Sequence, residues 1–369
     1  MKAVLISCFN WYKKRLEPIR EVLLKQGYEV KVFISDFDHL LKRPETNRYI
    51  ECTYIHVPEY RRNISMQRVH SHLSFGKSIS SNLEEYCPDI IYCLIPPNNV
   101  GESCKKYKER HPNTKLIIDI IDLWPESMPI GQIKNSYIGK KWENWRNSTI
   151  QVADYVFTEC DLFKEKLDNY LIPEKTSTLY LFKEQTKEEK MLVRTIVEQK
   201  EKNEHITKLA YLGSMNSIID IEGICEVIKQ FQKKGFECEL HAIGNGESKT
   251  KFQNAISATN CKSYFYGPVF DEAEKIKILA TCDYALNMMK KTVNVGLTIK
   301  SIDYLSYGLP LINNIQGDTW RIIEEEKIGF NIPVSTKNPT IKSSKEILNV
   351  YLKHFSKDAF MKTIESVLN

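Results

Sequence analysis

The chain has 369 residues, which at roughly 100–200 residues per domain is enough for two or three domains. Apolar residues make up 42% and charged residues 27%, a composition that excludes a disordered or collagen-like chain. No run approaches the roughly 18 apolar residues that a spanning helix needs, which excludes a transmembrane protein. Ten cysteines without a Cys-x-x-Cys pair predict reduced thiols in a cytosolic protein and no structural zinc site.

The positive charge is concentrated near the N-terminus. The net charge is +5, yet the first 80 residues hold 14 Lys and Arg against 8 Asp and Glu, a net of +6. A basic face attracts anionic lipid, phosphate or nucleic acid, while the simpler interpretation is a solvated surface. Both interpretations stay open at this point.

Strand-like apolar runs alternate with helical patterns through residues 1–182, where we expect the N-terminal domain. Such alternation predicts a parallel sheet covered by helices on both faces. The helical patterns include Pro18–Gln26 and Val69–Glu85, and the strand-like runs are Ala3–Cys8, Glu29–Ser35, Thr53–Pro58, Asp89–Ile95, Lys115–Ile121 and Asp154–Glu159.

Residues 183–205 are dense in charge and predict an exposed helix or linker between two domains. The alternation then restarts, which predicts a second parallel-sheet domain over 206–345. Its strand-like runs are Lys208–Leu212, Glu237–Ile243, Ser263–Tyr266, Asp283–Met288 and Pro310–Asn313, with Ile328–Val334 as a further candidate. Residues 346–369 are expected to form C-terminal helices that pack back on the N-terminal domain.

The most informative segment of the second half begins a helix near Leu297 and places Lys300 and Asp303 on one helical face. A lysine at a helix N-terminus favours a diphosphate, and an acid one turn later can accept hydrogen bonds from a diol. The plain alternative is an i,i+3 ion pair on a solvated face. The loop after the first strand, at Gly213 and Ser214, offers backbone amides to a phosphate or is an ordinary turn.

In the first half, Asp122, Trp124 and Glu126 emerge together where a buried strand ends. Asp122 suits an acid, a base or an anchor for a hydroxyl group. A helix cap is an equally good interpretation of Asp122 alone.

Four segments resemble those of bacterial family-4 glycosyltransferases that build surface polysaccharides. IDLWPES (121–127) looks like their D-L-W-P-E-S motif, and KSIDYLSYGLP (300–310) resembles their K-L-x-E-Y-L-A-A-G-x-P segment. YLGSM (211–215) and IGNGE (243–247) are similar to their first glycine loop and their G-[DN]-G turn. The order and spacing agree over essentially the whole chain.

The resemblance implies the GT-B architecture, in which two Rossmann-like parallel-sheet α/β domains face each other across a cleft that binds a nucleotide-sugar donor. In that family the acid at the position of Asp303 binds the donor ribose, and the lysine at the position of Lys300 lies against the diphosphate. The loop at Gly213 faces the donor phosphates, and the Asp-Leu-Trp-Pro segment lines the acceptor side.

The sequence departs from the family at three places. Val295 stands where many relatives carry a second acid, and the 213–223 segment lacks the Arg and Lys that neutralise the leaving diphosphate. The N-terminal glycine-rich loop is replaced by residues 8–15. We therefore expect Lys300 to carry the leaving-group charge, joined by Arg15.

The predicted function is retaining transfer of a sugar from a nucleoside-diphosphate donor, expected to be a UDP-sugar, to a lipid-linked or growing surface-polysaccharide acceptor. We expect a cytoplasmic protein that contacts the inner face of an anionic membrane, without a metal or other cofactor and without a nucleic-acid partner. The alternatives are a GT-B-fold sugar-nucleotide epimerase and a non-catalytic partner subunit of a glycosyltransferase.

The candidate site residues fall into three groups. The catalytic candidates are Lys300, Asp122 and Arg15. The donor-binding candidates are Gly213, Ser214, Gly244, Gly267, Val269, Asn294, Gly296, Leu297, Thr298, Lys300 and Asp303. The acceptor-side candidates are Asn10, Trp11, Trp124 and Glu126.

Overall fold

The computed structural model describes residues 1–128, 130–201, 203–293, 295–333 and 340–368. Asn294 of the predicted donor site and Val334 of the last predicted strand lie outside these ranges. The chain divides into two compact units, one of Met1–Leu181 with Phe360–Asn369 and one of Phe182–Ala359. Each unit is described by itself below.

The first unit is built on a seven-stranded sheet in which every neighbouring pair is parallel. The central strand β6 is buried at all six positions, as its unbroken IIYCLI sequence predicts for a strand covered on both faces. The order across the sheet is β5 (Cys52–Ile55), β2 (Glu29–Ser35), β1 (Lys2–Ser7), β6 (Ile90–Ile95), β7 (Lys115–Ile120), β8 (Tyr155–Thr158) and β9 (Thr176–Thr178).

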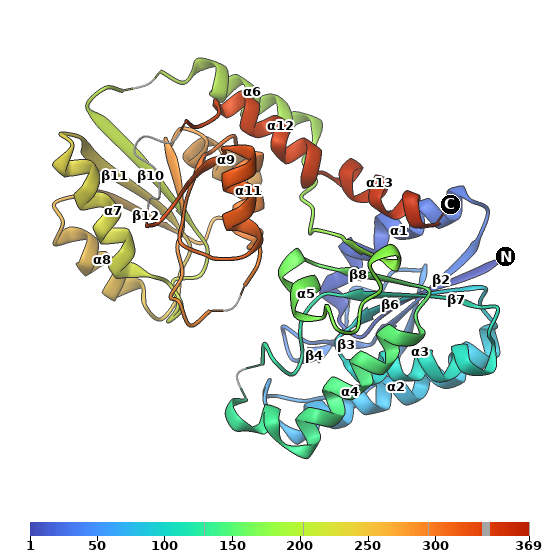
Figure 1. Cartoon of the computed structure of the whole chain (residues 1–369). Helices are drawn as coiled ribbons and strands as arrows, with labels where there is room; N and C mark the ends of the chain where they lie inside the picture. The colour runs from blue at the N-terminus through green and yellow to red at the C-terminus, as the bar shows by residue number, and fades with distance from the viewer. Residues whose placement is uncertain (129, 202, 294, 334–339, 369) are drawn as a thin grey trace. The chain divides into compact units, whose positions relative to one another are not determined.

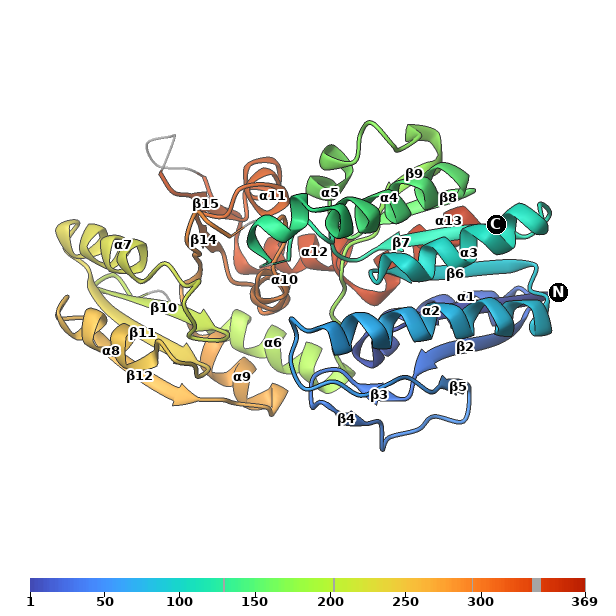
Figure 2. The ribbon, with the colours of Figure 1, turned by 90° about the horizontal axis from the view of Figure 1, so that it is seen from below.

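Helices cover both faces of this sheet (Figure 1). One face carries α2 (Met66–Tyr86), α3 (Asn98–Arg110) and α4 (Tyr137–Val152), of which α2 and α3 run side by side (Figure 2). The other face carries α1 (Lys13–Lys25) and the end of α13 (Lys357–Leu368), where the Val367 carbonyl accepts a hydrogen bond from Lys115. Short elements complete the unit: the antiparallel pair β3 (Phe37–Asp38) and β4 (Arg43–Pro44), the helix α5 (Asp161–Lys166) and the 3-10 turns η1 (Asn10–Tyr12), η2 (Gly131–Asn135) and η3 (Pro173–Lys175).

The second unit has a six-stranded sheet, again parallel throughout. The predicted two-sheet α/β fold class is therefore confirmed. The order is β12 (Lys262–Gly267), β11 (Glu237–Ile243), β10 (Ile206–Leu212), β13 (Tyr284–Asn287), β14 (Leu311–Asn313) and β15 (Gly329–Asn331).

The helices of the second unit include one from the charged segment that follows the first unit. This helix, α6 (Lys187–Gln199), begins with a capping box between Thr186 and Glu189. It packs against α9 (Glu272–Leu279) and α12 (Ser344–His354). In Figure 1, α7 and α8 lie on one face of the sheet, and α6, α9 and α12 lie on the other. The remaining bounds are α7 (Ile221–Lys233), α8 (Lys249–Ser257), α10 (Ile299–Ser306) and α11 (Asp318–Glu326). Among the described residues, no helix is both long enough and apolar enough to cross a bilayer.

Candidate active site

Two glycine loops meet at the carboxyl edge of the second sheet. Gly213 follows β10 and Gly244 follows β11, and both have a positive φ. A Cβ added to Gly244 would lie 1.9 Å from the Gly213 carbonyl oxygen, so only glycine fits this approach. The Gly213 amide donates to the Ile243 carbonyl at 3.0 Å, and the Gly244 amide donates to the Gly267 carbonyl at 2.8 Å.

These backbone bonds correct one expectation about the first loop. The Gly213 amide was expected to face a phosphate, but it already donates a hydrogen bond to the carbonyl of Ile243 at the end of β11. The Ser214 residue is exposed, and its amide donates to no described residue. Of these two amides, Ser214 is the one that an anion can bind.

Lys300 lies directly beside this loop. Its Cδ is 4.0 Å from the place where a Cβ on Gly213 would be, and its Nζ lies 5.4 Å from the ring centroid of Tyr211. The side chain is partly buried, and burial lowers its pKa to about 8. No carboxylate of the described residues forms an ion pair with it, so the i,i+3 pair with Asp303 is absent. A buried cation without a counter-ion favours the binding of an anion.

The start of α10 is held by a chain of buried amides that the sequence analysis missed. The Thr298 hydroxyl caps the helix by accepting from the Ser301 amide, and it donates to Asn287 Oδ1 at 2.9 Å. The Asn287 amide donates to Asn313, and Asn313 donates to Asn331, at 2.9 and 2.8 Å. Three neighbouring strands each end in Asn, which is the sequence signal for this ladder.

Asp303 is held by a lysine from the charged segment. Lys183 Nζ lies 2.7 Å from Asp303 Oδ1, and it also bonds to Glu272 and to the Tyr307 hydroxyl. Burial raises the pKa of Glu272, but the charge and hydrogen bond of Lys183, with bonds from Lys275 and Tyr307, lower it to about 2. Asp303 is thus held in place by a residue 120 positions earlier.

The other donor-site candidates lie in the loops around this edge. Gly267 ends β12, and Val269 is partly buried just after it. The Gly296 carbonyl accepts from the Thr319 amide and hydroxyl at 2.9 and 3.0 Å, which ties the loop before α10 to α11. Leu297 is partly buried in the same loop.

At the corresponding edge of the first sheet, Asp122 is bound within its own loop. Its Oδ1 accepts from the Leu123 amide at 2.8 Å, and its Oδ2 accepts from Trp124 Nε1 at 2.9 Å. Glu126 forms two bonds of 2.7 Å with Arg146, whose side chain is 1% exposed. These two acids fix the Asp-Leu-Trp-Pro loop, and Asp122 sets the orientation of the Trp124 ring.

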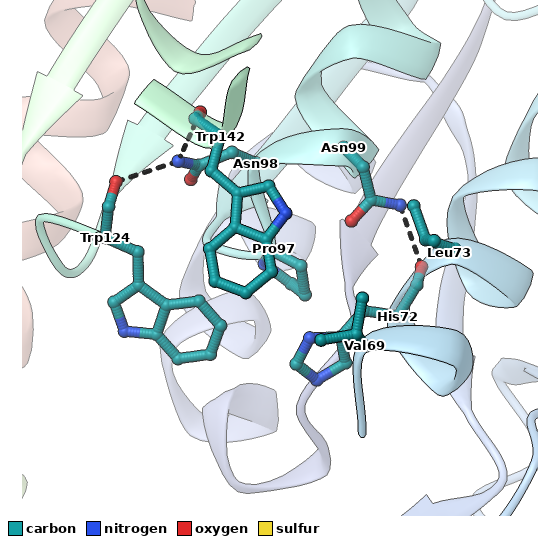
Figure 3. Close-up of a pocket in the computed structure, with 8 residues that line it drawn as sticks. All are labelled: Val69, His72, Leu73, Pro97, Asn98, Asn99, Trp124 and Trp142. Carbon is teal, nitrogen blue, oxygen red and sulfur yellow. Dashed lines mark hydrogen bonds between the residues drawn. The ribbon is translucent and has the colours of Figure 1, made fainter. Parts of the chain in front are cut away.

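Trp124 lines a small pocket with residues of α2, α3 and α4 (Figure 3). The enclosed space is about 10 Å³, which is room for roughly one water molecule. Asn98 donates to the carbonyls of Trp124 and Trp142, while its Oδ1 and the Nε2 of His72 are buried and have no hydrogen-bond partner among the described residues. Burial, with the charges of Arg68, His39 and Lys42, holds the pKa of His72 well below its usual range. The lining residues are Val69, His72, Leu73, Pro97, Asn98, Asn99, Trp124 and Trp142.

The remaining acceptor-side candidates join the same aromatic cluster. Trp11 is 37% exposed and stacks on Phe9 at 4.7 Å, and Phe9 contacts Trp124 edge-on at 5.9 Å. Asn10 is buried and donates to Glu45 at 2.6 Å. The structure therefore brings Trp11 and Trp124 into one cluster through Phe9, whereas the side-chain amide of Asn10 is bound to Glu45.

Arg15 does not fit its predicted role. It is 3% exposed, and its guanidinium forms two bonds with Asp119 and one with the Leu179 carbonyl. Asp119 also accepts from the Tyr92 hydroxyl. A buried arginine that is bound in this way neutralises an acid of its own unit, and breaking the pair would be costly. The expectation that Arg15 reaches a leaving diphosphate is therefore wrong.

Comparison with solved structures places this arrangement among known folds. The chain matches, over its full length, the lipopolysaccharide outer core galactosyltransferase WaaB in its apo form, with 15% identity, a TM-score of 0.68 and 99% of that chain covered. The chain has the GT-B fold. It also matches HepE of Anabaena in complex with UDP (11% identity, TM-score 0.65) and sucrose-phosphate synthase from Thermosynechococcus elongatus (12%, 0.60), again over its full length, covering 99% and 95% of those chains. No protein-family model matches the chain, and no curated protein does.

Proposed function

We propose that the protein is a retaining glycosyltransferase of the family-4 type whose second unit binds a nucleoside-diphosphate sugar, with UDP as the nucleotide. The observation that carries the proposal is Lys300, a partly buried lysine that has no counter-ion among the described residues and lies beside Gly213 and the exposed residue Ser214. A diphosphate supplies the anion that this arrangement lacks. The likeness to HepE, whose structure contains UDP, supports the same choice of nucleotide.

The proposed reaction breaks the bond between the sugar and the diphosphate, so negative charge develops on the departing phosphate. Fixed positive charge at that point stabilises the transition state, and this is usually the largest catalytic contribution. Lys300 supplies a full charge, and the backbone amides at the N-terminus of α10 supply a partial one. The proposal assigns no metal to this step.

Asp303 completes the donor site in this proposal. Lys183 donates to one of its carboxylate oxygens and orients the group. The second oxygen accepts from the ribose diol. In a retaining transfer the acceptor attacks from the face that the phosphate leaves, and the departing phosphate takes the hydroxyl proton, so no strong protein base is required.

We place the acceptor on the first unit and infer that it is a lipid-linked or growing surface oligosaccharide. The aromatic cluster of Trp11, Phe9 and Trp124 offers flat apolar surface, which suits the carbon face of a sugar ring. The acceptor would be met at the cytoplasmic face of an anionic membrane.

The loops of the first unit support a peripheral membrane contact. Lys42 of one loop donates to Asn63 of another at 2.5 Å, so the two loops lie together. Arg61 and Arg62 are exposed on the second loop. Cations beside exposed apolar groups match an anionic bilayer surface, where each cation contributes about 1 kcal/mol. The exposed apolar side chains of these loops and their neighbours are Leu40, Leu41, Tyr49, Ile50, Ile64 and Met66.

A thermal-shift screen against nucleotide sugars tests the function. A ligand at 100 times its Kd adds roughly 2.7 kcal/mol to the free energy of unfolding. Each stabilising donor is then incubated with and without acceptors, and the sugar product is analysed. Transfer with retained configuration supports the proposal; an epimerised nucleotide sugar indicates an epimerase instead. A protein that no nucleotide sugar stabilises would contradict it.

A further inference from the structure

Glu159 is an acid at the carboxyl edge of the first sheet that the sequence analysis did not consider. It follows β8 directly, and its amide donates to the Ile120 carbonyl at 2.9 Å. Since β7 and β8 are parallel neighbours, this bond places Glu159 next to the residues that follow β7, where Asp122 lies. The two acids thus emerge side by side at the same edge.

The surroundings of Glu159 differ from those of the nearby acids. Asp119 is bound by Arg15 and Tyr92, and Asp122 is bound by Leu123 and Trp124. Asp161, two residues later, accepts from the hydroxyl groups of Thr178 and Tyr180. The Glu159 side chain forms no hydrogen bond or ion pair with any described residue, although it is partly buried.

The charged groups around Glu159 come from three elements. Burial raises its pKa most, Arg15 of α1 lowers it, and Asp119 and Asp122 at β7 raise it again, to about 8. Tyr12 of η1 is close as well, since Glu159, once ionised at high pH, helps to raise the pKa of that phenol. The carboxyl group is therefore protonated at neutral pH and both donates and accepts hydrogen bonds.

We propose that Glu159 binds a hydroxyl group of the acceptor sugar and is the acid that positions it, while Asp122 positions Trp124. This inference rests on the proposed glycosyl transfer. A neutral carboxyl matches a hydroxyl group, which also donates and accepts. The hydroxyl group keeps its proton for the departing phosphate. Ionisation of Glu159 replaces its donor with a negative charge and weakens acceptor binding.

Three variants test this role: Glu159→Gln, Glu159→Ala and, as a matched control, Glu165→Gln on the exposed face of the next helix. The probes are the nucleotide sugar that stabilises the protein and a panel of alkyl monosaccharide glycosides as acceptors, between pH 6 and 10. In the wild type and in Glu165→Gln, we expect the acceptor KM to rise about tenfold per pH unit above pH 8, as for one ionising group. Glu159→Gln should keep a low KM without this rise, and Glu159→Ala should have a high KM at every pH. At each pH, the donor KM of all three variants should equal that of the wild type.

A second measurement needs no substrate. Because the folded protein holds the proton of Glu159 more tightly than the unfolded chain, the stability from this proton is present below about pH 4.5 and is lost as the pH rises to about 8. The melting temperature of the wild type should therefore fall relative to that of Glu159→Gln over this range.

The outcomes are separable. A Glu159→Gln variant with the wild-type rise in acceptor KM overturns the role of Glu159 while glycosyl transfer stands. Parallel melting curves across the pH range overturn the protonated carboxyl on their own. If no nucleotide sugar supports transfer to any acceptor, the proposed function fails, and the acceptor role fails with it.

Discussion

Replacing Lys300 by methionine removes the charge that the donor site offers to a diphosphate and keeps the length of the side chain. Burial lowers the pKa of Lys300 to about 8, whereas a bound diphosphate returns it to the ordinary range of a lysine or above. At pH 8.5 about three quarters of the free protein then lacks this proton, and binding of UDP must restore it. At pH 7 the uptake falls to about a tenth of a proton.

The same shift predicts how Lys300 affects folding. A lysine with a lowered pKa in the folded state costs stability at neutral pH, and the stability returns as the pH rises from about 8 towards 10.5. The cost at pH 7 is at most about 3–4 kcal/mol, because the pKa shift is about 2.5 units and one unit corresponds to roughly 1.4 kcal/mol. Lys300→Met should therefore be at least as stable as the wild type at neutral pH, so a loss of function cannot be attributed to unfolding.

Titration calorimetry with UDP at pH 8.5, in buffers of different ionisation enthalpy, counts the protons taken up. We expect about three quarters of a proton for the wild type and for a control, Lys277→Met, whose lysine is exposed on α9. Lys300→Met should bind UDP without proton uptake and should lower kcat by roughly 10²–10³, as for loss of one donor to a developing anion. Equal proton uptake in Lys300→Met and wild type would refute the assignment of Lys300 to the diphosphate.

Three further predictions concern the donor site and the membrane. Asp303→Ala should weaken UDP binding by about 1.5–3 kcal/mol, the contribution of hydrogen bonds to a charged group, and an unchanged Kd in a folded variant would remove Asp303 from the site. Gly244→Ala should lower the melting temperature and abolish UDP binding, because its Cβ would overlap the carbonyl of Gly213; wild-type melting would show that the loops are not packed in this way. Reversal of Arg61 and Arg62 to Glu should reduce sedimentation with anionic vesicles at low salt and leave UDP affinity intact, and a wild-type protein that stays wholly in the supernatant with such vesicles contradicts membrane docking.

The fold was predictable because its signals are local. An unbroken apolar run such as Ile90–Ile95 suits only a strand covered on both faces, and it appears as β6. The start of the first helix was harder to predict from the sequence. Pro18 suggested a helix start, yet α1 begins at Lys13. The ion pair of Arg15 with Asp119 fixes the first turn of that helix, and no local pattern reveals a partner 104 residues away.

In the candidate site, too, residues in contiguous motifs were predictable, whereas contacts between residues distant in the chain were not. Lys300 and Gly213 were predicted from contiguous motifs, and the structure places them side by side. The sequence placed Lys183 in a charged linker. Its role at Asp303 could not be predicted, because its three partners lie 89 to 124 residues later in the chain. Glu159 was missed because its distinguishing property is that no described residue binds its side chain, and this becomes visible only when the partners of the neighbouring acids are known.

The amide ladder beneath α10 has a direction. Thr298 donates to Asn287, Asn287 to Asn313 and Asn313 to Asn331, and Asn331 donates in turn to the Trp320 carbonyl of α11. Every proton in this series points the same way, so turning one amide over would place oxygen against oxygen on one side and hydrogen against hydrogen on the other. The orientation of each asparagine is therefore set by its neighbours, from the capping hydroxyl of one helix to the backbone of the next. An aspartate has nearly the same shape as asparagine at any of these positions. It has no side-chain N–H, however, so it could not donate the next hydrogen bond of the series.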